Sequence, residues 1–403
     1  MPVTPPVEPP VKPAARFEAA RLIKAQPDYD LIVVGASFAG LIAARTAAHR
    51  GLKVGVLDAK REPGARVRTT GVLVKEAAEE IDIPASLTRK INGVRLYAPN
   101  HRYTDLFAPG YYFLATDTAA LMRWLAREAQ RAGADLLFGT RFEGAHYDGP
   151  LLRLSGCGLS ARYLLGADGA KSRVAQHFNL GRNRDFLIGL ETEYDPFDGI
   201  PPDLLHCFID STLAPGYLGW VIPGAGMTQI GLAVSPKLTG TERRPDYNRF
   251  LSTVHPLFPG LLSIRERNRR SGPIPCGGLV HPLSTRQVLL TGDAAGLVSP
   301  LTAGGIRLAF HYGRQAGFAI ASHLQDGGID PGAAMAKAYP RFASKKLIRQ
   351  AWSVAPPNAV LNATLFTPPM RALARQIYFQ TRRQPATGQT PVPLSADNNP
   401  VDA

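Results

Sequence analysis

Cysteine is scarce in this chain of 403 residues, which contains three, at Cys157, Cys207 and Cys276. They lie far apart and form no Cys-x-x-Cys pair. This spacing predicts neither a disulfide framework nor a zinc site, so we expect reduced cysteines and no bound metal.

Long apolar runs are absent as well. A membrane-spanning helix needs ~20 unbroken apolar residues, and the apolar segment after Leu289 is interrupted by Asp293, Arg307 and His311. The N-terminal residues 1–27 are rich in proline and contain no apolar stretch typical of a signal peptide. We therefore expect disordered tails over 1–27 and 384–403, and a cytoplasmic protein.

Acidic residues are the smaller charge class, with 32 against 46 basic residues and a formal net charge of +14. Such an excess suits nucleic acid, anionic lipid or an anionic cofactor. The basic residues are densest at 265–270, 343–350 and 371–383, and no nucleic-acid-binding motif accompanies them. We expect no nucleic-acid partner and favour a solvated surface or attraction to an anionic membrane surface.

The hydrophobic content of 45% allows a large core, and the segment from Tyr29 to Lys60 shows how part of it is built. It reads as a buried strand, a tight turn, an alanine-rich helix and a second strand, which is the βαβ pattern of dinucleotide binding. Gly35 permits the turn, and Asp58 is placed to accept both hydroxyls of an adenosine ribose. Ser37 replaces the usual middle glycine. The predicted cofactor-binding residues here are Gly35, Ser37, Phe38, Ala39, Gly40, Asp58, Ala59, Lys60 and, downstream, Arg68.

A second segment, ARYLLGADGAKSRVAQHF, covers residues 161–178. A strand rises to Gly166, Asp168 and Gly169 form a turn, and a helix begins near Ser172. Taken alone, this is best interpreted as an ordinary strand–turn–helix junction. Beside the first segment, Asp168 and Gly169 become candidate cofactor-binding residues.

The third segment, VLLTGDAAGLVSPLTAGGI, covers residues 288–306. It predicts a strand that ends at Gly292 and Asp293, a loop stiffened by Pro300, and a helix that begins with free N–H groups. A flavin fits this arrangement, because Asp293 is placed to bind the ribityl chain and the helix start faces the pyrimidine edge of the ring. The candidate residues are Gly292, Asp293, Pro300, Gly304, Gly305 and Ile306.

In this order, GASFAG, GADGAKSRV and GDAAGLVSPLTAGGI resemble the FAD-dependent oxidoreductases that include p-hydroxybenzoate-type hydroxylases and geranylgeranyl reductases. The resemblance runs from about Tyr29 to Leu324. Hydroxylases of this group usually carry a histidine after GDAA and an asparagine just after the glycine pair, whereas Gly296 and Arg307 sit near those places here. The third motif is similar to the reductase branch.

The resemblance implies an α/β fold, with a Rossmann-like FAD-binding domain interleaved with an antiparallel-sheet substrate domain and a helical C-terminal region. We expect the FAD-binding domain over 28–90, 117–182 and 283–328, the substrate sheet over 91–116 and 183–282, and C-terminal helices over 329–383. Alternating apolar and polar residues around 94–116 support strands there.

A fourth stretch, residues 214–234, is similar to the P-G-x-Y-x-W-x-F-P segment of the reductases. Leu218 stands in the family's tyrosine place, and Tyr217 comes one position early. We take Tyr217 and Trp220 as candidate catalytic residues; the alternative is a core strand with two large aromatics. Two further departures are Thr69, in the place of a cysteine, and Thr118, in the place of an arginine.

The resemblance implies FAD as cofactor, NADPH or NADH as reductant, and a hydrophobic small-molecule or lipid substrate of isoprenoid type whose carbon–carbon double bonds are reduced. Two alternatives remain open. The first is an FAD-dependent monooxygenase or halogenase acting on a hydrophobic or aromatic small molecule. The second is a flavin-binding protein without turnover that associates peripherally with membranes through its basic C-terminal helices.

Overall fold

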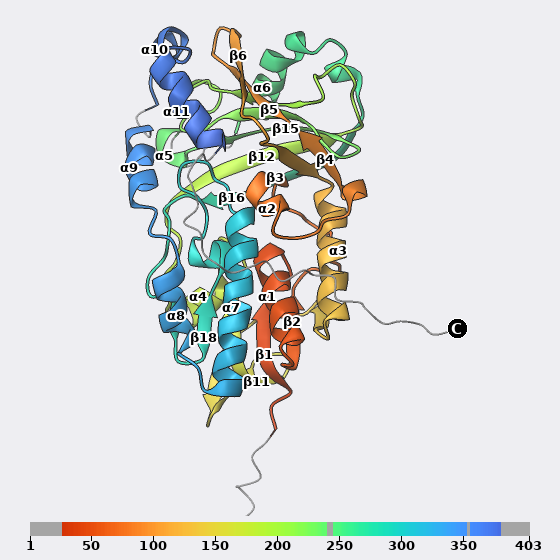
Figure 1. The fold of residues 1–403 in the computed structure, drawn as a ribbon, viewed down its shortest axis with the longest axis vertical. Coiled ribbons are helices and arrows are strands. Elements are labelled where there is room, and N and C mark those ends of the chain that lie inside the picture. Colours follow the sequence, from red (N-terminus) through yellow and green to blue (C-terminus); the bar gives the residue numbers. More distant parts are fainter. Residues whose placement is uncertain (1–25, 240–244, 353–354, 380–403) are drawn as a thin grey trace, which may run out of the picture.

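The computed structural model describes residues 26–239, 245–352 and 355–379. Most of the predicted N-terminal tail, the predicted tail 384–403 and the end of the predicted helical region at 380–383 lie outside these residues. Two large sheets stand one above the other in Figure 1, and α7 (Ile306–Asp326) runs along the lower one.

The lower sheet has eight strands, and its centre is parallel in the order β18-β11-β1-β2-β8. These strands are β18 (Val288–Leu290), β11 (Ser160–Gly166), β1 (Tyr29–Val34), β2 (Val54–Asp58) and β8 (Asp135–Phe138). Three antiparallel strands extend it, β17 (Ser284–Thr285), β10 (Leu151–Leu154) and β9 (Ala145–Asp148). Parallel strands end at the same edge, so the turns that follow β1, β11 and β18 meet there.

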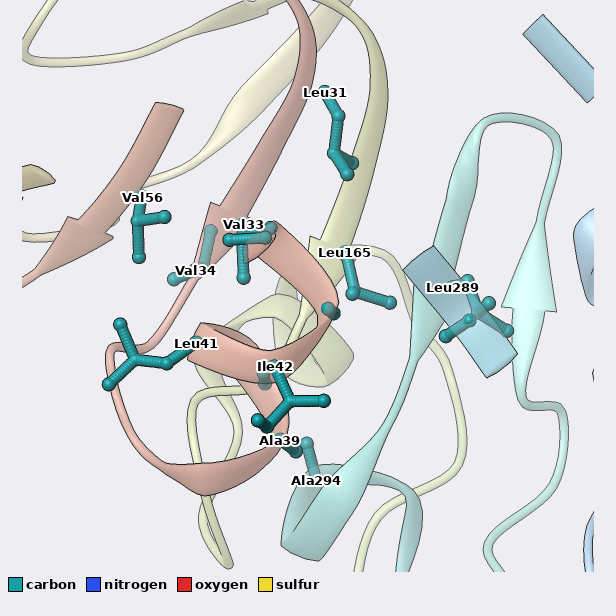
Figure 2. Packing of buried hydrophobic residues seen from close by; sticks show 14 of the residues in the cluster. Leu31, Val33, Val34, Ala39, Leu41, Ile42, Val56, Leu165, Leu289 and Ala294 are labelled. Atoms are coloured by element: carbon teal, nitrogen blue, oxygen red, sulfur yellow. The ribbon is translucent and has the colours of Figure 1, made fainter. Parts of the chain in front are cut away.

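The lower core forms where α1 (Phe38–His49) packs on β1 and β2. In Figure 2, Leu41 and Ile42 of α1 lie beside Val33 and Val34 of β1, and Ala294 approaches Ala39. A buried strand surface of Val, Leu and Ile gives this contact its stability, about 1.5–3 kcal/mol for each fully buried side chain. The packing fixes the start of α1 against the strand ends.

Other helices complete the lower half. The α1 helix contacts α3 (Thr118–Arg131) and α7, and α7 contacts α8 (Pro331–Ala338). The approach of α7 to α1 is close, because a Cβ on Gly317 would stand 2.4 Å from the carbonyl oxygen of Ala43. A short α4 (Arg173–His177) follows β11.

The upper sheet has seven strands in the order β16-β12-β15-β14-β13-β5-β6. They are β16 (Glu266–Pro275), β12 (Phe186–Tyr194), β15 (Thr228–Val234), β14 (Gly219–Pro223), β13 (Leu204–Phe208), β5 (Gly93–Tyr97) and β6 (Tyr103–Phe107). All neighbours are antiparallel except β13 and β5, which are parallel. The expected antiparallel-sheet domain is confirmed, with this one parallel pair, in which a long part of the chain separates the two strands and no hairpin fixes their direction.

The sequence-based division also placed residues 113–116 in the substrate sheet. The structure instead pairs β7 (Phe113–Thr116) with β3 (Val72–Val74) and β4 (Thr88–Ile91) in a separate three-stranded sheet. The turn at Gly110, with φ of 68°, lies between β6 and β7. This small sheet also carries α2 (Lys75–Ala78) and the 3-10 turn η2 (Ala85–Leu87).

Residues 186–276 contain helices that the sequence reading did not anticipate. They are α5 (Pro236–Thr239), α6 (Tyr247–Val254) and the 3-10 turns η3 (His255–Leu257) and η4 (Leu261–Ser263). The α6 helix begins at Asp246, whose side chain accepts a hydrogen bond from the Arg249 N–H at 3.0 Å. It packs on β15.

The C-terminal helices α9 (Ala343–Trp352), α10 (Asn358–Thr364) and α11 (Pro368–Phe379) lie beside the upper sheet, at the left of Figure 1. Asn358 fixes α10 to the loop after β13, donating to Asp210 at 2.9 Å and accepting from the Ser211 N–H at 2.9 Å. Across 26–239, 245–352 and 355–379, no helix combines the length and the apolar character that crossing a bilayer demands.

Candidate active site

A single cavity of about 910 Å³ joins the strand ends of the lower sheet to the upper sheet and to α9 and α11. All three glycine-containing motifs line it, as do both candidate catalytic residues. The nucleotide end is the part lined by the motifs, and the apolar end is the part lined by the upper sheet, α9 and α11.

Gly35 forms the tight turn between β1 and α1. Its φ is +111°, and a Cβ there would lie 2.3 Å from the carbonyl oxygen of Ala167. Ser37 occupies the N-cap position of α1 but makes no capping hydrogen bond with its side chain. The free N–H groups of the first turn therefore remain available to an anion such as a pyrophosphate.

Asp58, the last residue of β2, holds this turn in place. One carboxylate oxygen accepts from the Ala36 N–H at 2.8 Å, and the other accepts from the Lys60 N–H at 2.8 Å. The Lys60 ammonium lies 3.7 Å away. Since each carboxylate oxygen can accept more than one hydrogen bond, Asp58 keeps capacity for the ribose hydroxyls that the sequence assigns to it.

Asp168 begins α4. Its carboxylate accepts from the Ser172 hydroxyl and from the Arg173 N–H, each at 2.6 Å, and burial still raises its pKa. This is the strand–turn–helix junction that the sequence alone suggests. Asp168 and Gly169 also line the cavity, so the junction is part of the nucleotide end.

The third motif differs slightly from expectation. Strand β18 ends at Leu290, and Gly292–Ala295 form a 3-10 turn, η5, rather than the end of the strand. The Thr291 N–H donates to the Gly166 carbonyl and closes the ladder with β11. Asp293 is thereby placed in the cavity wall.

The Asp293 carboxylate accepts no hydrogen bond from any of the described residues, and burial raises its pKa to about 6. A buried carboxylate without a partner is costly, so a ligand with hydroxyl donors suits this position. Asn183, which the sequence analysis missed, donates both to the Asp293 main-chain carbonyl at 2.8 Å and to that of Ala170 at 3.1 Å. It lies in a polar loop whose pattern gives no signal, and it links the second and third motifs.

The α7 helix begins beside Asp293. Gly305 is its N-cap residue and has no side-chain cap, and Gly304, Gly305 and Ile306 line the cavity. Pro300 and Gly40, although predicted as cofactor-binding residues, do not line it. Pro300 is buried within the loop. Gly40 serves helix packing, since a Cβ there would lie 1.9 Å from the Gly35 carbonyl oxygen.

These observations fit FAD. The glycine turn leaves an uncapped helix start for a pyrophosphate, Asp58 stands at the end of β2 for a ribose, and the unpartnered Asp293 faces the cavity beside a second uncapped helix start. Phe38, Ala39, Ala59 and Arg68 complete the predicted set in the cavity wall. Within the described ranges, no three or more His, Cys, Asp or Glu side chains form a group that could hold a metal ion.

Tyr217 and Trp220 both line the cavity, and both are anchored by their polar atoms. The Tyr217 hydroxyl donates to the Thr302 carbonyl at 2.6 Å, and burial raises its pKa, so it stays protonated. The Trp220 indole N–H donates to Glu191 at 2.6 Å. Each aromatic ring is thus held in one orientation.

A buried ion pair supports Trp220. Glu191 accepts from the Nε of Arg270 at 2.8 Å, and the Arg270 guanidinium also lies 2.8 Å from Glu193. Sequence reasoning missed this network, because Arg270 belongs to the basic run 265–270 that was interpreted as surface. The run is partly buried, with Arg270 only 8% exposed.

The family model for FAD-binding domains matches residues 28–249, more than half of the chain. Digeranylgeranylglycerophospholipid reductase of Methanosarcina acetivorans is 28% identical over 326 residues, covering 75% of this chain and 77% of the relative. Geranylgeranyl diphosphate reductase of Rhodobacter capsulatus is 30% identical over 313 residues, covering 74% and 76%. The chain belongs to the geranylgeranyl reductase family of FAD-dependent oxidoreductases.

Solved structures agree on the fold. A geranylgeranyl bacteriochlorophyll reductase-like protein from Thermoplasma acidophilum superposes with a TM-score of 0.75 at 22% identity, over 88% of this chain and 97% of that one. The flavin-dependent brominase Bmp2 gives a TM-score of 0.66 at 17% identity, over 88% and 94%. At such identities the likeness concerns the architecture that reductases and halogenases share.

Two departures from the reductase pattern have structural explanations. Thr118 is fully buried, and its hydroxyl lies 3.1 Å from that of Thr116 and 3.4 Å from the Thr70 carbonyl. It therefore supports the loop that carries Arg68 and Thr69, and no arginine reaches the cavity from this position. Thr69 lines the cavity and offers a side chain without a thiol.

Proposed function

We propose that this reductase-family protein reduces carbon–carbon double bonds of a hydrophobic, isoprenoid-type lipid. The observation that carries the proposal is the continuity of the cavity. Its nucleotide end fits FAD, and it continues without a break into a chamber with apolar side chains from both the upper sheet and the C-terminal helices. These include Leu96, Leu205, Ile222, Leu365, Leu373 and Ile377, and Phe113 of the small three-stranded sheet adds to them.

The relatives support the same substrate class. Their names describe reductases of geranylgeranyl diphosphate and of digeranylgeranylglycerophospholipid, both of which carry long unsaturated apolar chains. The apolar end of the cavity suits such a chain, because burial of apolar surface supplies binding energy at roughly 25 cal/mol per Å².

FAD, once bound and reduced, supplies the hydride for the reaction. The protein's own contribution is positional. The anchored rings of Tyr217 and Trp220 keep an alkene in one place, and an aromatic face beside developing positive charge stabilises it by ~0.5–2 kcal/mol. Glu191 and Arg270 fix the indole, so Trp220 cannot turn away from the cavity without leaving a buried carboxylate oxygen unpaired.

The residues around Asp293 complete the site. The uncapped start of α7 favours negative charge beside Gly305, typically by 0.3–1 kcal/mol. The Tyr217 hydroxyl is engaged with the Thr302 carbonyl in the loop that leads into α7. We infer that this bond positions the substrate wall against the cofactor rather than delivering a proton.

The runner-up function is an FAD-dependent monooxygenase or halogenase. Gly296 is evidence against a monooxygenase of the hydroxylase type. This residue has φ of +72°, and a Cβ would lie 2.2 Å from the Gly278 carbonyl oxygen. A histidine, usual near this place in the hydroxylases, has no room without a shift of the main chain.

Two finer features belong to the same proposal. We propose NADPH or NADH as the reductant of the flavin, although no second dinucleotide motif is present in the sequence to bind it. We also propose peripheral association with an anionic membrane, where a long-chain substrate resides, because the C-terminal helices are basic and carry exposed apolar residues.

An anaerobic experiment tests the reaction. The bound flavin is reduced, geranylgeranyl lipids are added, and flavin reoxidation is followed by absorbance while mass spectrometry detects addition of two hydrogens. A fully saturated analogue is the control. We expect reoxidation with the unsaturated lipid only. In a parallel run with oxygen admitted, rapid reoxidation that yields an oxygenated or halogenated product supports the runner-up instead.

A further inference from the structure

The cavity has an opening at its apolar end, between α9 and α11. Ile348 of α9 both lines the cavity and is 38% exposed, so it stands at the opening. Met370 and Leu373 of α11 line the same end and are partly exposed. The neighbouring Leu347 is 69% exposed and does not line the cavity. An apolar passage therefore leads from the surface to the wall that holds Tyr217.

The helices around this opening are fixed to the body of the protein. Arg349 is buried, and its guanidinium donates to the Gly216 carbonyl at 2.6 Å, one residue before Tyr217. Val360 of α10 is 46% exposed, although Asn358 of the same helix is bonded into the loop after β13. The exposed apolar residues are therefore held outward by polar contacts on the inner side.

The C-terminal helices around the opening carry charge of one sign. Between Asp330 and Asp397 the sequence contains no acidic residue. Within the described part of the chain, Lys346, Arg371 and Arg375 form no ion pair. The basic run 265–270 is different, since Arg265 and Arg267 both pair with Asp195 and Arg269 pairs with Glu266. The C-terminal helices thus place unneutralised positive charge beside the opening.

We infer that the opening between α9 and α11 is the entrance by which a lipid chain passes directly from an anionic bilayer into the cavity. In this arrangement Leu347, Ile348 and Val360 enter the apolar layer, while Lys346, Arg371 and Arg375 contact acidic headgroups. Each basic residue at such a surface contributes about 1 kcal/mol. The inference rests on the proposed lipid substrate but concerns the route of entry, which binding measurements test without turnover.

Site-specific labelling tests the docking. The flavin-loaded protein carries Cys157→Ser, which removes the exposed native thiol, and one new cysteine at Leu347, at Ile348 or, as a control, at Leu262, which is 58% exposed on η4. Each is labelled with an environment-sensitive dye. We expect a blue shift at 347 and 348 with vesicles of phosphatidylcholine and phosphatidylglycerol, none with phosphatidylcholine alone, and none at 262. A shift at 262 alone, or no shift at low salt, overturns the docking.

A matched pair of variants tests the entrance. Ile348→Trp narrows the opening, whereas Leu347→Trp adds the same bulk outside it. Radiolabelled geranylgeraniol is presented in anionic vesicles, and its transfer to the protein is measured after the vesicles are removed by flotation. We expect the transfer rate to fall about tenfold for Ile348→Trp, equivalent to about 1.4 kcal/mol of barrier, and to stay at the wild-type level for Leu347→Trp.

The possible outcomes distinguish the proposed lipid entrance from the proposed reductase activity. Wild-type transfer by Ile348→Trp refutes the entrance even where the labels insert into the bilayer. Slow transfer by both variants points to lost membrane contact and also counts against it, as does a dimer that buries Leu347 in solution without vesicles. Transfer that depends on Ile348, together with no reduction of any unsaturated lipid by the wild type, supports the entrance and refutes the proposed function.

Discussion

At the nucleotide end of the cavity the turns after β1, β11 and β18 converge, and their glycines bring main-chain atoms close to the cavity. At the apolar end the wall consists of side chains from the upper sheet, α9 and α11. The first wall is tight at Gly35, where a Cβ would lie 2.3 Å from a carbonyl oxygen. The second is held by a few polar anchors, among them the bonds of Tyr217 and Arg349.

This difference predicts how each end of the cavity responds to substitutions. A wall of main-chain atoms recognises a cofactor through its phosphates and hydroxyls, and single substitutions there act as steric blocks. A wall of apolar side chains tolerates changes that conserve volume, usually at under 1.5 kcal/mol. We therefore expect a bulky substitution at Gly35 to abolish cofactor binding, and substitutions at the apolar end to change substrate preference.

The strongest test of this comparison is Gly35→Val. Valine resists a φ of +111°, and its branched side chain collides with the Ala167 carbonyl and with a pyrophosphate at the start of α1. We expect the purified variant to contain no FAD, as measured by the ratio of flavin absorbance to protein. Circular dichroism establishes whether the variant is folded.

Gly169→Ala is the matched control for this variant. Gly169 also has positive φ, +83°, and also lines the cavity, but no atom lies within 4 Å of an added Cβ. We expect a modest loss of stability and retained flavin. Full flavin content in folded Gly35→Val contradicts the assignment of the first motif.

A smaller effect is expected at Asp58. Removal of its carboxylate in Asp58→Ala loses charge-assisted hydrogen bonds to the ribose and weakens FAD binding by about 1.5–3 kcal/mol. Titration of flavin-free protein with FAD, followed by fluorescence quenching, measures this. Asp58→Asn, which keeps one acceptor for the Ala36 N–H or the Lys60 N–H, should lie between the two. If Asp58→Ala binds FAD as tightly as the wild type does, Asp58 only supports the turn and does not bind the ribose.

The nucleotide end could be predicted from the sequence because short stretches of neighbouring residues identify it. Gly35, Asp58, Asp168 and Asp293 each lie at a strand end that hydrophobic pattern and turn residues identify. The fold class followed from the order of three such motifs. Errors of detail arose where main-chain hydrogen bonds, which the pattern does not show, decide the boundary, as at the 3-10 turn that begins at Gly292.

The apolar end was less accessible, because it depends on contacts between distant residues. Nothing near Glu191 signals its pairing with Arg270, and the basic run around Arg270 looks like exposed surface. Asn183 gives no pattern at all. The pairing of β7 with β3 and β4 depends on where the chain goes after a turn at Gly110, which alternation of residues cannot specify.

The unpartnered carboxylate of Asp293 should make the stability of the flavin-free protein depend on pH. Burial raises its pKa to about 6 in the folded protein, above the ~3.9 of an unfolded chain, so the folded state binds the proton more tightly. The stabilisation is present in full below pH ~4 and is lost as pH rises through about 6. We expect flavin-free wild type to lose about 3 kcal/mol across this window relative to Asp293→Asn.

Denaturant unfolding at several pH values measures this difference. Glu80, whose pKa burial also raises to about 6, titrates equally in both proteins and cancels. Parallel stability profiles for the two proteins would mean that Asp293 is already solvated or paired. FAD added to the wild type should reduce the pH dependence, because its ribityl hydroxyls then donate to the carboxylate.

The smallest effect we predict compares two buried tyrosines that each donate to a main-chain carbonyl. Tyr217 bonds to Thr302 at 2.6 Å in the wall of the cavity, and Tyr339 bonds to Leu290 at 2.9 Å away from the cavity wall. Each change to phenylalanine leaves a carbonyl without this donor and should cost about 1 kcal/mol of unfolding free energy. Only Tyr217→Phe should also lower the rate of lipid reduction, because it releases the substrate wall from the loop leading into α7. If both variants lose the same stability but only Tyr217→Phe reduces lipids more slowly, Tyr217 has a positioning role. If both variants reduce lipids at the same rate, the bond of Tyr217 is structural only.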